Sequence, residues 1–280
     1  MDCALHDPIA TSWAIPLPST LAFAGTVLLY AAGWRRLRAA SPGDTPSWRL
    51  AAFVAGMIAL WLAVCSPLST LDHVSLTLHM VQHLVTMTVA APLILLGRPG
   101  VALALALPGC RRPDARALLR AVAGRIGRAL THPVACWLAG TGVVVAWHVP
   151  GLHELGMTSP WHAVQHASFL VGGLLFWSPV IGAGRRFAVV SDSHAVLYLF
   201  LAALPCDALS AFLAFCGRVV YHAHSAHAVL GLSPLQDQEL AGGLMWVWVT
   251  FAYLLPATFM TVRMLSPSGS SNLGGHVHAR

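Results

Sequence analysis

Long apolar runs alternate along this chain with short segments that hold nearly all of its charge. Because about 20 consecutive apolar residues cross the hydrocarbon core of a bilayer as a helix, each run predicts one crossing. The seven runs, of which the fourth is short, are residues 17–34, 48–68, 76–97, 133–149, 161–181, 194–217 and 240–262. Only helices and closed barrels satisfy their backbone in lipid. We therefore expect an all-α, polytopic membrane bundle of seven transmembrane helices.

Composition supports a membrane protein. The chain is 57% hydrophobic and only 9% charged, with a mean hydropathy of +0.70, whereas soluble domains carry roughly 25% charged residues. We expect residues 1–280 to form a single membrane domain with a disordered tail at 266–280. Residues 113–130 space apolar side chains four apart between arginines, which predicts an amphipathic helix on the inner leaflet, with an ordinary basic loop as the alternative.

The arginines predict the orientation of the bundle. All 16 basic residues are arginine, and they follow the first, third, fifth and seventh runs, while the intervening connections hold only Arg218. Positively charged loops stay in the cytoplasm, so we expect the N-terminus outside and the C-terminus inside. The pI near 9.4 then reflects topology and contact with anionic membrane lipid, and gives no reason to expect nucleic-acid binding.

Two five-residue boxes stand out within the third and fifth runs. His79-Met80-Val81-Gln82-His83 and His162-Ala163-Val164-Gln165-His166 each place two imidazoles four residues apart, on one face of a helix and about 6 Å from each other. Both boxes and His148 fall at the same depth, near the outer surface, and His73 lies close by. A single histidine there is typically a polar helix contact, but two matching pairs favour a metal or haem site.

Other side chains extend this polar layer. Met80 offers a soft thioether beside the first box. Asp207 follows Pro205 near mid-membrane and is a candidate proton relay, ligand or interhelical contact. Cys216 lies near the outer end of the sixth run and could pair, bind Cu(I) or do neither. The outer connection adds a histidine run that reads as a metal-binding tract or as a solvated loop: His222, His224 and His227.

Several motifs together resemble the CtaG-type cytochrome c oxidase assembly factors of bacteria. These motifs include the two boxes, Trp147-His148-Val149-Pro150, Leu175-Phe176-Trp177-Ser178-Pro179 and Asp237-Gln238-Glu239-Leu240-Ala241-Gly242-Gly243-Leu244-Met245-Trp246. The resemblance implies a seven-helix protein of the bacterial cytoplasmic membrane that helps haem–copper oxidases mature and is not itself an enzyme. It implies functional roles for the box histidines, His148 and the pair Asp237 and Gln238. It also implies copper as the cofactor.

Our hypothesis is a transient copper site in the outer leaflet. Its ligands would be the four box histidines, with His148 and Met80 as auxiliary ligands. Asp237 and Gln238, at the entry to the seventh helix, would orient ligands or cap the helix. The partners would be the catalytic subunit of cytochrome c oxidase, docking on the outer loops, and an extracytoplasmic copper chaperone.

Four other readings stay open. A membrane di-iron hydroxylase also uses boxes of this spacing, but it normally adds a His-His pair, which this chain lacks. A b-type cytochrome could bind haem between His83 and His166. A metal transporter would need ligands along its whole path, where Asp207 is the mid-membrane candidate. Finally, the histidines could be interhelical contacts in a protein that only holds a partner. A retinal protein is excluded because a chain without lysine cannot form its Schiff base.

Overall fold

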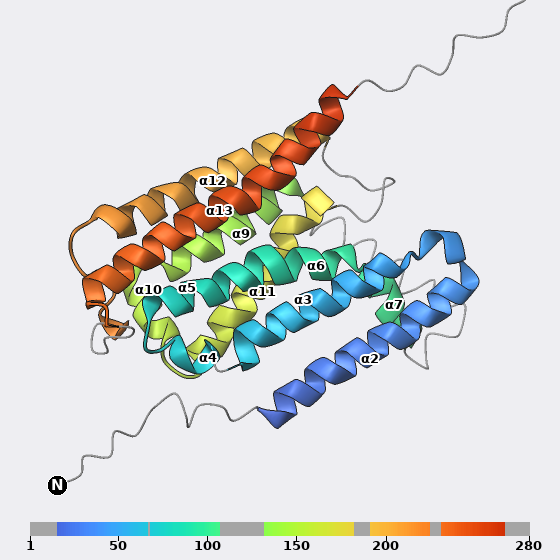
Figure 1. Ribbon diagram of the computed structural model, residues 1–280, viewed down its shortest axis with the longest axis horizontal. Helices are drawn as coiled ribbons and strands as arrows, with labels where there is room; N and C mark the ends of the chain where they lie inside the picture. The colour runs from blue at the N-terminus through green and yellow to red at the C-terminus, as the bar shows by residue number, and fades with distance from the viewer. Residues whose placement is uncertain (1–15, 67, 107–131, 182–190, 225–230, 267–280) are drawn as a thin grey trace, which may run out of the picture.

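A computed structural model describes residues 16–66, 68–106, 132–181, 191–224 and 231–266. All regular secondary structure within these ranges is helical, as predicted (Figure 1). The predicted amphipathic segment 113–130 and the tail beyond residue 266 lie outside the described residues.

The long helices are α2 (Leu17–Ala40), α3 (Ser47–Cys65), α9 (Pro133–Trp147), α11 (Trp161–Ile181), α12 (Asp192–Phe215) and α13 (Pro234–Leu265). The third predicted crossing consists of α5 (Leu76–Leu84), η2 (Val85–Ala90) and α6 (Ala91–Leu96). The short elements are η1 (Pro42–Asp44), α4 (Leu68–Leu71), α7 (Pro99–Ala106), α10 (Pro150–Gly156) and η4 (His222–His224).

Six of the seven predicted crossings are single spans long and apolar enough to cross a membrane. The fourth is different, because α9 has only 15 residues and the chain then bends by 86° into α10; the pair counts as a seventh span only if it is taken together. The bend lies before Pro150, since a residue that precedes proline is driven out of helical geometry, and Val149 is extended at φ −68° and ψ 123°. The orientation of the termini stays a prediction.

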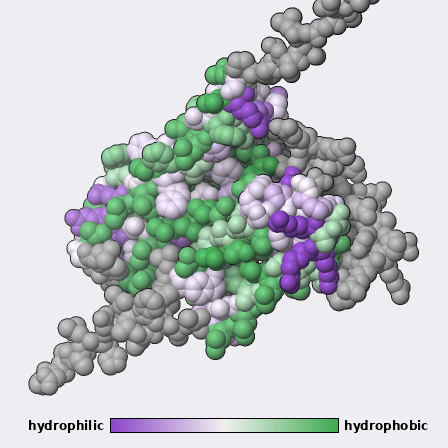
Figure 2. Space-filling model, turned by 45° about the vertical axis from the view of Figure 1, so that its right-hand side comes forward, coloured by the Kyte–Doolittle hydropathy of each residue, from purple (hydrophilic) through white to green (hydrophobic). Residues whose placement is uncertain are grey.

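The helices pack in pairs around a central span. α12 lies along α13, α11 along α9, and the α5–η2–α6 span contacts α13, α11 and α3 (Figure 1). Large apolar side chains such as Leu255 and Phe259 point outward and are about two-thirds exposed, at 65% and 67%. Figure 2 shows this apolar surface over much of one face, with hydrophilic side chains gathered in a few patches. An apolar exterior of this kind suits a lipid environment.

The central span changes its helical geometry directly after His83. Residues 85–90 form a π-helical turn, in which the Ala91 N–H donates to the carbonyl of Thr86, five residues earlier. Such turns contain one residue more than α geometry needs and occur mostly at functional sites. The carbonyl of Met87 in this turn accepts a hydrogen bond of 2.9 Å from Nε1 of Trp177 on α11. The irregular turn is therefore held against α11.

A glycine in α2 permits its close contact with α7. A Cβ built on Gly33 would lie 1.8 Å from the carbonyl oxygen of Ala102, whereas one built on Gly25 of the same helix would meet nothing within 4 Å. We expect Gly33→Ala to lower the free energy of unfolding by about 1–3 kcal/mol, the usual cost of overpacking. Gly25→Ala should leave it unchanged or raise it by up to about 1 kcal/mol. Thermal unfolding in detergent compares the two, and equal stability would contradict the tight contact.

Candidate metal site

The first box lies on α5 as its spacing predicts. His79 and His83 point from one face of the helix, and their Nε2 atoms are 2.8 Å apart. Both side chains are almost completely buried, with exposed fractions of 1% and 5%. Two imidazole nitrogens at this distance share one proton, so one ring donates and the other accepts.

The second box lies on α11 and meets a carboxylate that the sequence analysis did not single out. The Nε2 atoms of His162 and His166 are 3.0 Å apart. Oδ2 of Asp72, a residue with no exposed surface, lies 3.1 Å from Nε2 of His162 and 3.9 Å from Nε2 of His166. Within the described ranges, these three residues form the one group of histidine, cysteine or acidic side chains whose ligand atoms are close enough together to hold a metal ion.

The two boxes join into a continuous string of imidazoles. The rings of His83 and His166 connect α5 to α11, with centroids 5.3 Å apart. At one end, the ring centroids of His73 and His162 are 4.7 Å apart. At the other end, the ring centroid of His79 lies 5.2 Å from that of His153 and 5.5 Å from that of His224. In spatial order the string contains His73, His162, His166, His83, His79, His153 and His224.

Three members of this site were missed or left open by the sequence analysis. Asp72 had a signal, because it is one of only ten acidic residues in the chain and directly precedes His73. His153 lies on α10, and only the sharp bend after α9 brings it back over His79. His224, whose role was left open, donates a hydrogen bond of 2.9 Å from its Nε2 to the backbone carbonyl of Asp72. Burial lowers the pKa of His224, so this ring is neutral near pH 7.

Many polar atoms of the string have no hydrogen-bond partner within the described part of the chain. A buried polar atom left unpaired typically costs about 1–3 kcal/mol, so each one needs an explanation. An unpaired imidazole nitrogen that carries no proton can bind a metal; in each box the ring whose Nε2 accepts has its proton on Nδ1, so only its partner offers a free Nδ1. The unpaired atoms are Nδ1 of His79, His83, His166 and His224, Nε2 of His153, and Oδ1 of Asp72.

Asp237 anchors the helix that carries the first box. It lies in the first turn of α13, which begins at Pro234, six residues before the predicted crossing, because Ser233 and Gln236 form a capping box. Its carboxylate accepts hydrogen bonds from the N–H and Oγ groups at the start of α5, at 2.6–3.2 Å: Ser75 Oγ, Leu76 N, Thr77 N and Thr77 Oγ1. Asp237 therefore caps α5, and its carboxylate is also near enough to His224 to interact with it electrostatically.

Gln238 fixes the segment between α12 and η4. Its Oε1 accepts a hydrogen bond of 2.6 Å from the N–H of Val220, and its Nε2 donates to the carbonyl of Arg218 at 2.9 Å. The same Nε2 lies 3.2 Å from the sulfur of Cys216, which places this cysteine in the loop contact and not in the string. Gln238 thus positions the chain that leads to His224.

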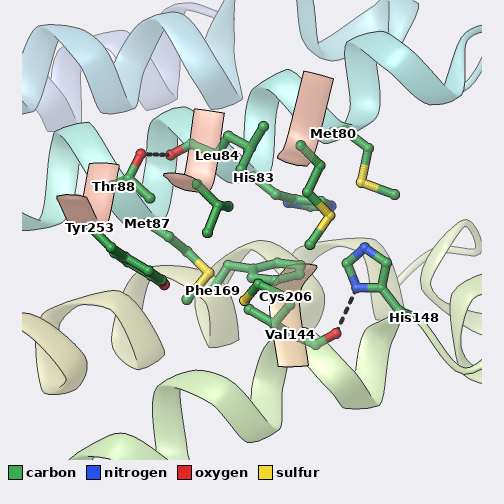
Figure 3. A pocket seen from close by; sticks show the side chains of 12 residues that line it. Met80, His83, Leu84, Met87, Thr88, Val144, His148, Phe169, Cys206 and Tyr253 are labelled. Atoms are coloured by element: carbon green, nitrogen blue, oxygen red, sulfur yellow. Dashed lines mark hydrogen bonds between the residues drawn. The ribbon is translucent and has the colours of Figure 1, made fainter. Parts of the chain in front are cut away.

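The remaining predicted residues lie at other places. Met80 and His148 line a small cavity beside His83 (Figure 3). Asp207 is partly buried on α12, next to the cavity-lining Cys206, and its Oδ1 has no hydrogen-bond partner within the described residues. His222 lines a second pocket with Arg218 and Tyr221. His227 lies outside the described residues.

Comparisons with known proteins agree with the resemblance drawn from the motifs. No curated protein and no solved structure matches the chain. The family model of the cytochrome c oxidase caa3 assembly factor, Caa3_CtaG, matches residues 28–266. This range contains every described helix except the first half of α2, and it includes both histidine boxes, Asp72 and the Asp237–Gln238 pair. The chain therefore belongs to the cytochrome c oxidase caa3 assembly factor family.

Proposed function

We propose that this protein binds copper as cargo at the imidazole string and passes it to the catalytic subunit of a cytochrome c oxidase during assembly. The observation that carries the proposal is the convergence of Asp72 with His162 and His166, joined through His83 to the other box. Asp72 is buried, its carboxylate contacts His162, His166 and His73, and its Oδ1 has no hydrogen-bond partner within the described residues. A bound cation would give it one.

The donor set suits copper. Imidazole binds Cu(I) and Cu(II), and Cu(II) stands at the top of the divalent affinity series. A single carboxylate among neutral imidazoles balances the charge of one Cu(I), which limits the cost of burying the ion. Because the ligands come from separate elements, a small shift of α11 against α5 would separate them. Such a shift would release the ion by breaking metal–ligand bonds, with no covalent change in the protein.

The geometry favours this reading over the two other metal-containing readings. The cavity beside His83 has a volume of about 30 Å³, enough for one ion or one water but not for a porphyrin. A membrane di-iron hydroxylase normally adds a His-His pair to its histidine boxes, and this chain has none.

The proposed orientation places the string near the outer surface of the bacterial cytoplasmic membrane. In the described ranges, all arginines except Arg218 lie at the opposite end of the bundle from the string: Arg35, Arg36, Arg38, Arg49, Arg98 and Arg263. This distribution supports a cytoplasmic location for that end. An extracytoplasmic copper chaperone could then load the string, and the oxidase subunit could receive copper from the same side.

Metal analysis of the detergent-purified protein tests the proposal. Wild type is compared with a variant that carries His162→Ala and His166→Ala, whose partly exposed side chains make the change tolerable for folding. The matched control is His194→Ala, an exposed histidine at the start of α12 that bonds only to Ser191. Each protein is incubated with Cu(I) and a competing chelator, and copper content and the absorbance spectrum are recorded.

We expect copper in wild type and in the control, loss of the copper held by Asp72 and the second box in the double variant, and no haem band in any of them. Equal copper binding by the double variant would contradict a site at Asp72 and the second box. A haem band or stoichiometric iron in wild type would replace the proposal with one of the alternatives.

A further inference from the structure

A second group of metal-binding side chains surrounds the cavity beside the string. The cavity lies between the α5–η2 span, α9, α11, α12 and α13, and Figure 3 shows side chains from these elements converging on it. Its volume of about 30 Å³ suits one ion. Half of its twelve lining residues carry sulfur or imidazole: Met80, Met87, Met245, Cys206, His83 and His148.

His148 presents a free nitrogen in this cavity. Its Nδ1 lies 2.6 Å from the carbonyl oxygen of Val144, so Nδ1 carries the proton and donates it. The lone pair must then lie on Nε2, which is buried and has no hydrogen-bond partner in the described part of the protein. A carbonyl bond to one ring nitrogen is the usual way in which proteins orient the other nitrogen toward a metal. The hydroxyl of Tyr221 further holds the His148 backbone, through a bond of 2.8 Å to its carbonyl.

The sulfur-containing side chains around this cavity are more than apolar packing requires. Methionine commonly fills gaps in apolar cores, and one thioether would need no further reason. Here three thioethers and a thiol surround a cavity next to an unpaired imidazole nitrogen, and no carboxylate lines it. Without an anionic ligand the cavity cannot stabilise a divalent ion well, whereas a soft monovalent ion matches neutral sulfur and imidazole donors.

We infer that this cavity is a second metal site, selective for Cu(I), with His148 and the thioethers of Met80, Met87 and Met245 as its donors. His83 lines the cavity and also contacts His79 and His166 in the string, so it connects the two sites. The direction of transfer, from the string into the cavity, rests on the proposed function; the site itself does not. In the transfer, Cu(I) exchanges the Asp72 carboxylate and the imidazoles of the string for the neutral sulfur and imidazole donors of the cavity, and its oxidation state does not change.

The test uses the full-length protein in detergent, with Cu(I) as the probe under anaerobic, reducing conditions. The variant His162→Ala/His166→Ala lacks the proposed string site. We expect it to retain about one Cu(I), and X-ray absorption at the copper edge should report sulfur together with nitrogen neighbours. Adding Met80→Leu, Met87→Leu and Met245→Leu, which nearly conserve volume, should remove the sulfur signal and lower Cu(I) affinity by at least about tenfold.

The outcomes separate this inference from the proposed function. If wild type binds copper through nitrogen and oxygen alone, and the histidine variant binds none, the string site stands and the cavity site is wrong. If the histidine variant keeps a sulfur-bound ion, the cavity site stands, whatever the string does. Circular dichroism shows whether the variant with the three added leucines is folded. If it is unfolded, the single changes Met80→Leu and Met245→Leu, each added to the histidine variant, are measured by the same X-ray absorption experiment. Undiminished sulfur scattering in both would overturn the inference.

Discussion

Cells in which the only copy of this protein carries alanine at both His162 and His166 are expected to contain almost no active caa3-type oxidase. The reason is that the variant removes two imidazoles of the proposed copper group and leaves Asp72 without its hydrogen-bond partner. We expect oxidase activity in isolated membranes to fall at least about tenfold, comparable with losses caused by altering metal-site residues. The measurements are oxidase turnover, copper content of the purified oxidase, and the membrane level of the variant.

The membrane level decides how this result is interpreted. Because the change leaves the buried Asp72 carboxylate without its hydrogen-bond partner, oxidase activity is compared at equal membrane levels of variant and wild type. The control His194→Ala should support normal oxidase activity. Normal activity with the double variant would contradict copper delivery through the string, and would leave a role in holding the oxidase subunit during assembly.

The second large effect is expected from Asp237→Ala. The Asp237 carboxylate accepts hydrogen bonds from the start of α5, and alanine would leave the buried Ser75 hydroxyl and Leu76 N–H unpaired, whereas the Thr77 hydroxyl keeps its bond to the backbone carbonyl of residue 237. We expect a loss of about 3 kcal/mol in the free energy of unfolding. Because α5 carries His79 and His83, we also expect weaker copper binding. Thermal unfolding and Cu(I) titration in detergent measure the two effects.

Two variants at the same turn sharpen this experiment. Asp237→Asn keeps the shape and one acceptor oxygen, so its effects should be smaller than those of alanine. Glu239→Ala removes a neighbouring carboxylate that is only partly buried and should change little. If Asp237→Ala and Glu239→Ala are equally stable, the cap does not hold α5 in place.

Local patterns predicted the parts of this site that depend on one helix. The four-residue spacing of each box places both imidazoles on one face, and the structure has the Nε2 atoms 2.8 Å and 3.0 Å apart. The apolar runs likewise predicted the helices, because span length is set by the bilayer and not by the neighbours of the helix. The boundaries were less accurate: α13 begins at Pro234, where a capping box extends the helix beyond the apolar run.

The members of the site that approach from other elements were not predictable in the same way. Asp72 lies 90 residues from His162, and His224 reaches the string only through the path of the chain after α12. His153 comes close to His79 because the chain bends by 86° before α10. No spacing in the sequence encodes these contacts, since they depend on how the helices pack.

The helix α5 contributes side chains to both the cavity and the imidazole string, as Met80 and His79 show. The sequence indicates that Met80 is next to His79 and three residues before His83, which suggested a single ligand set. Successive residues of an α-helix point about 100° apart, so Met80 and His79 face different neighbours. The structure accordingly has Met80 at the cavity and His79 toward His153 and His224. The predicted role of Met80 as a copper ligand stays a prediction, now attached to the cavity.

The π-helical turn at residues 85–90 sets the rotation of α5 relative to α6 within the central span. An α-helix with one residue fewer would cover the same rise, so conversion of this turn to α geometry would rotate α5 by about 100° relative to α6 and move it by about 1.5 Å. That rotation would take the ring of His83 off Phe169, on which it stacks at 4.0 Å, and away from His166. Deleting a single residue from this turn would instead give an α-helical span in which α5 keeps its present rotation relative to α6. The contacts of His83 with Phe169 and His166 therefore depend on the extra residue in this turn.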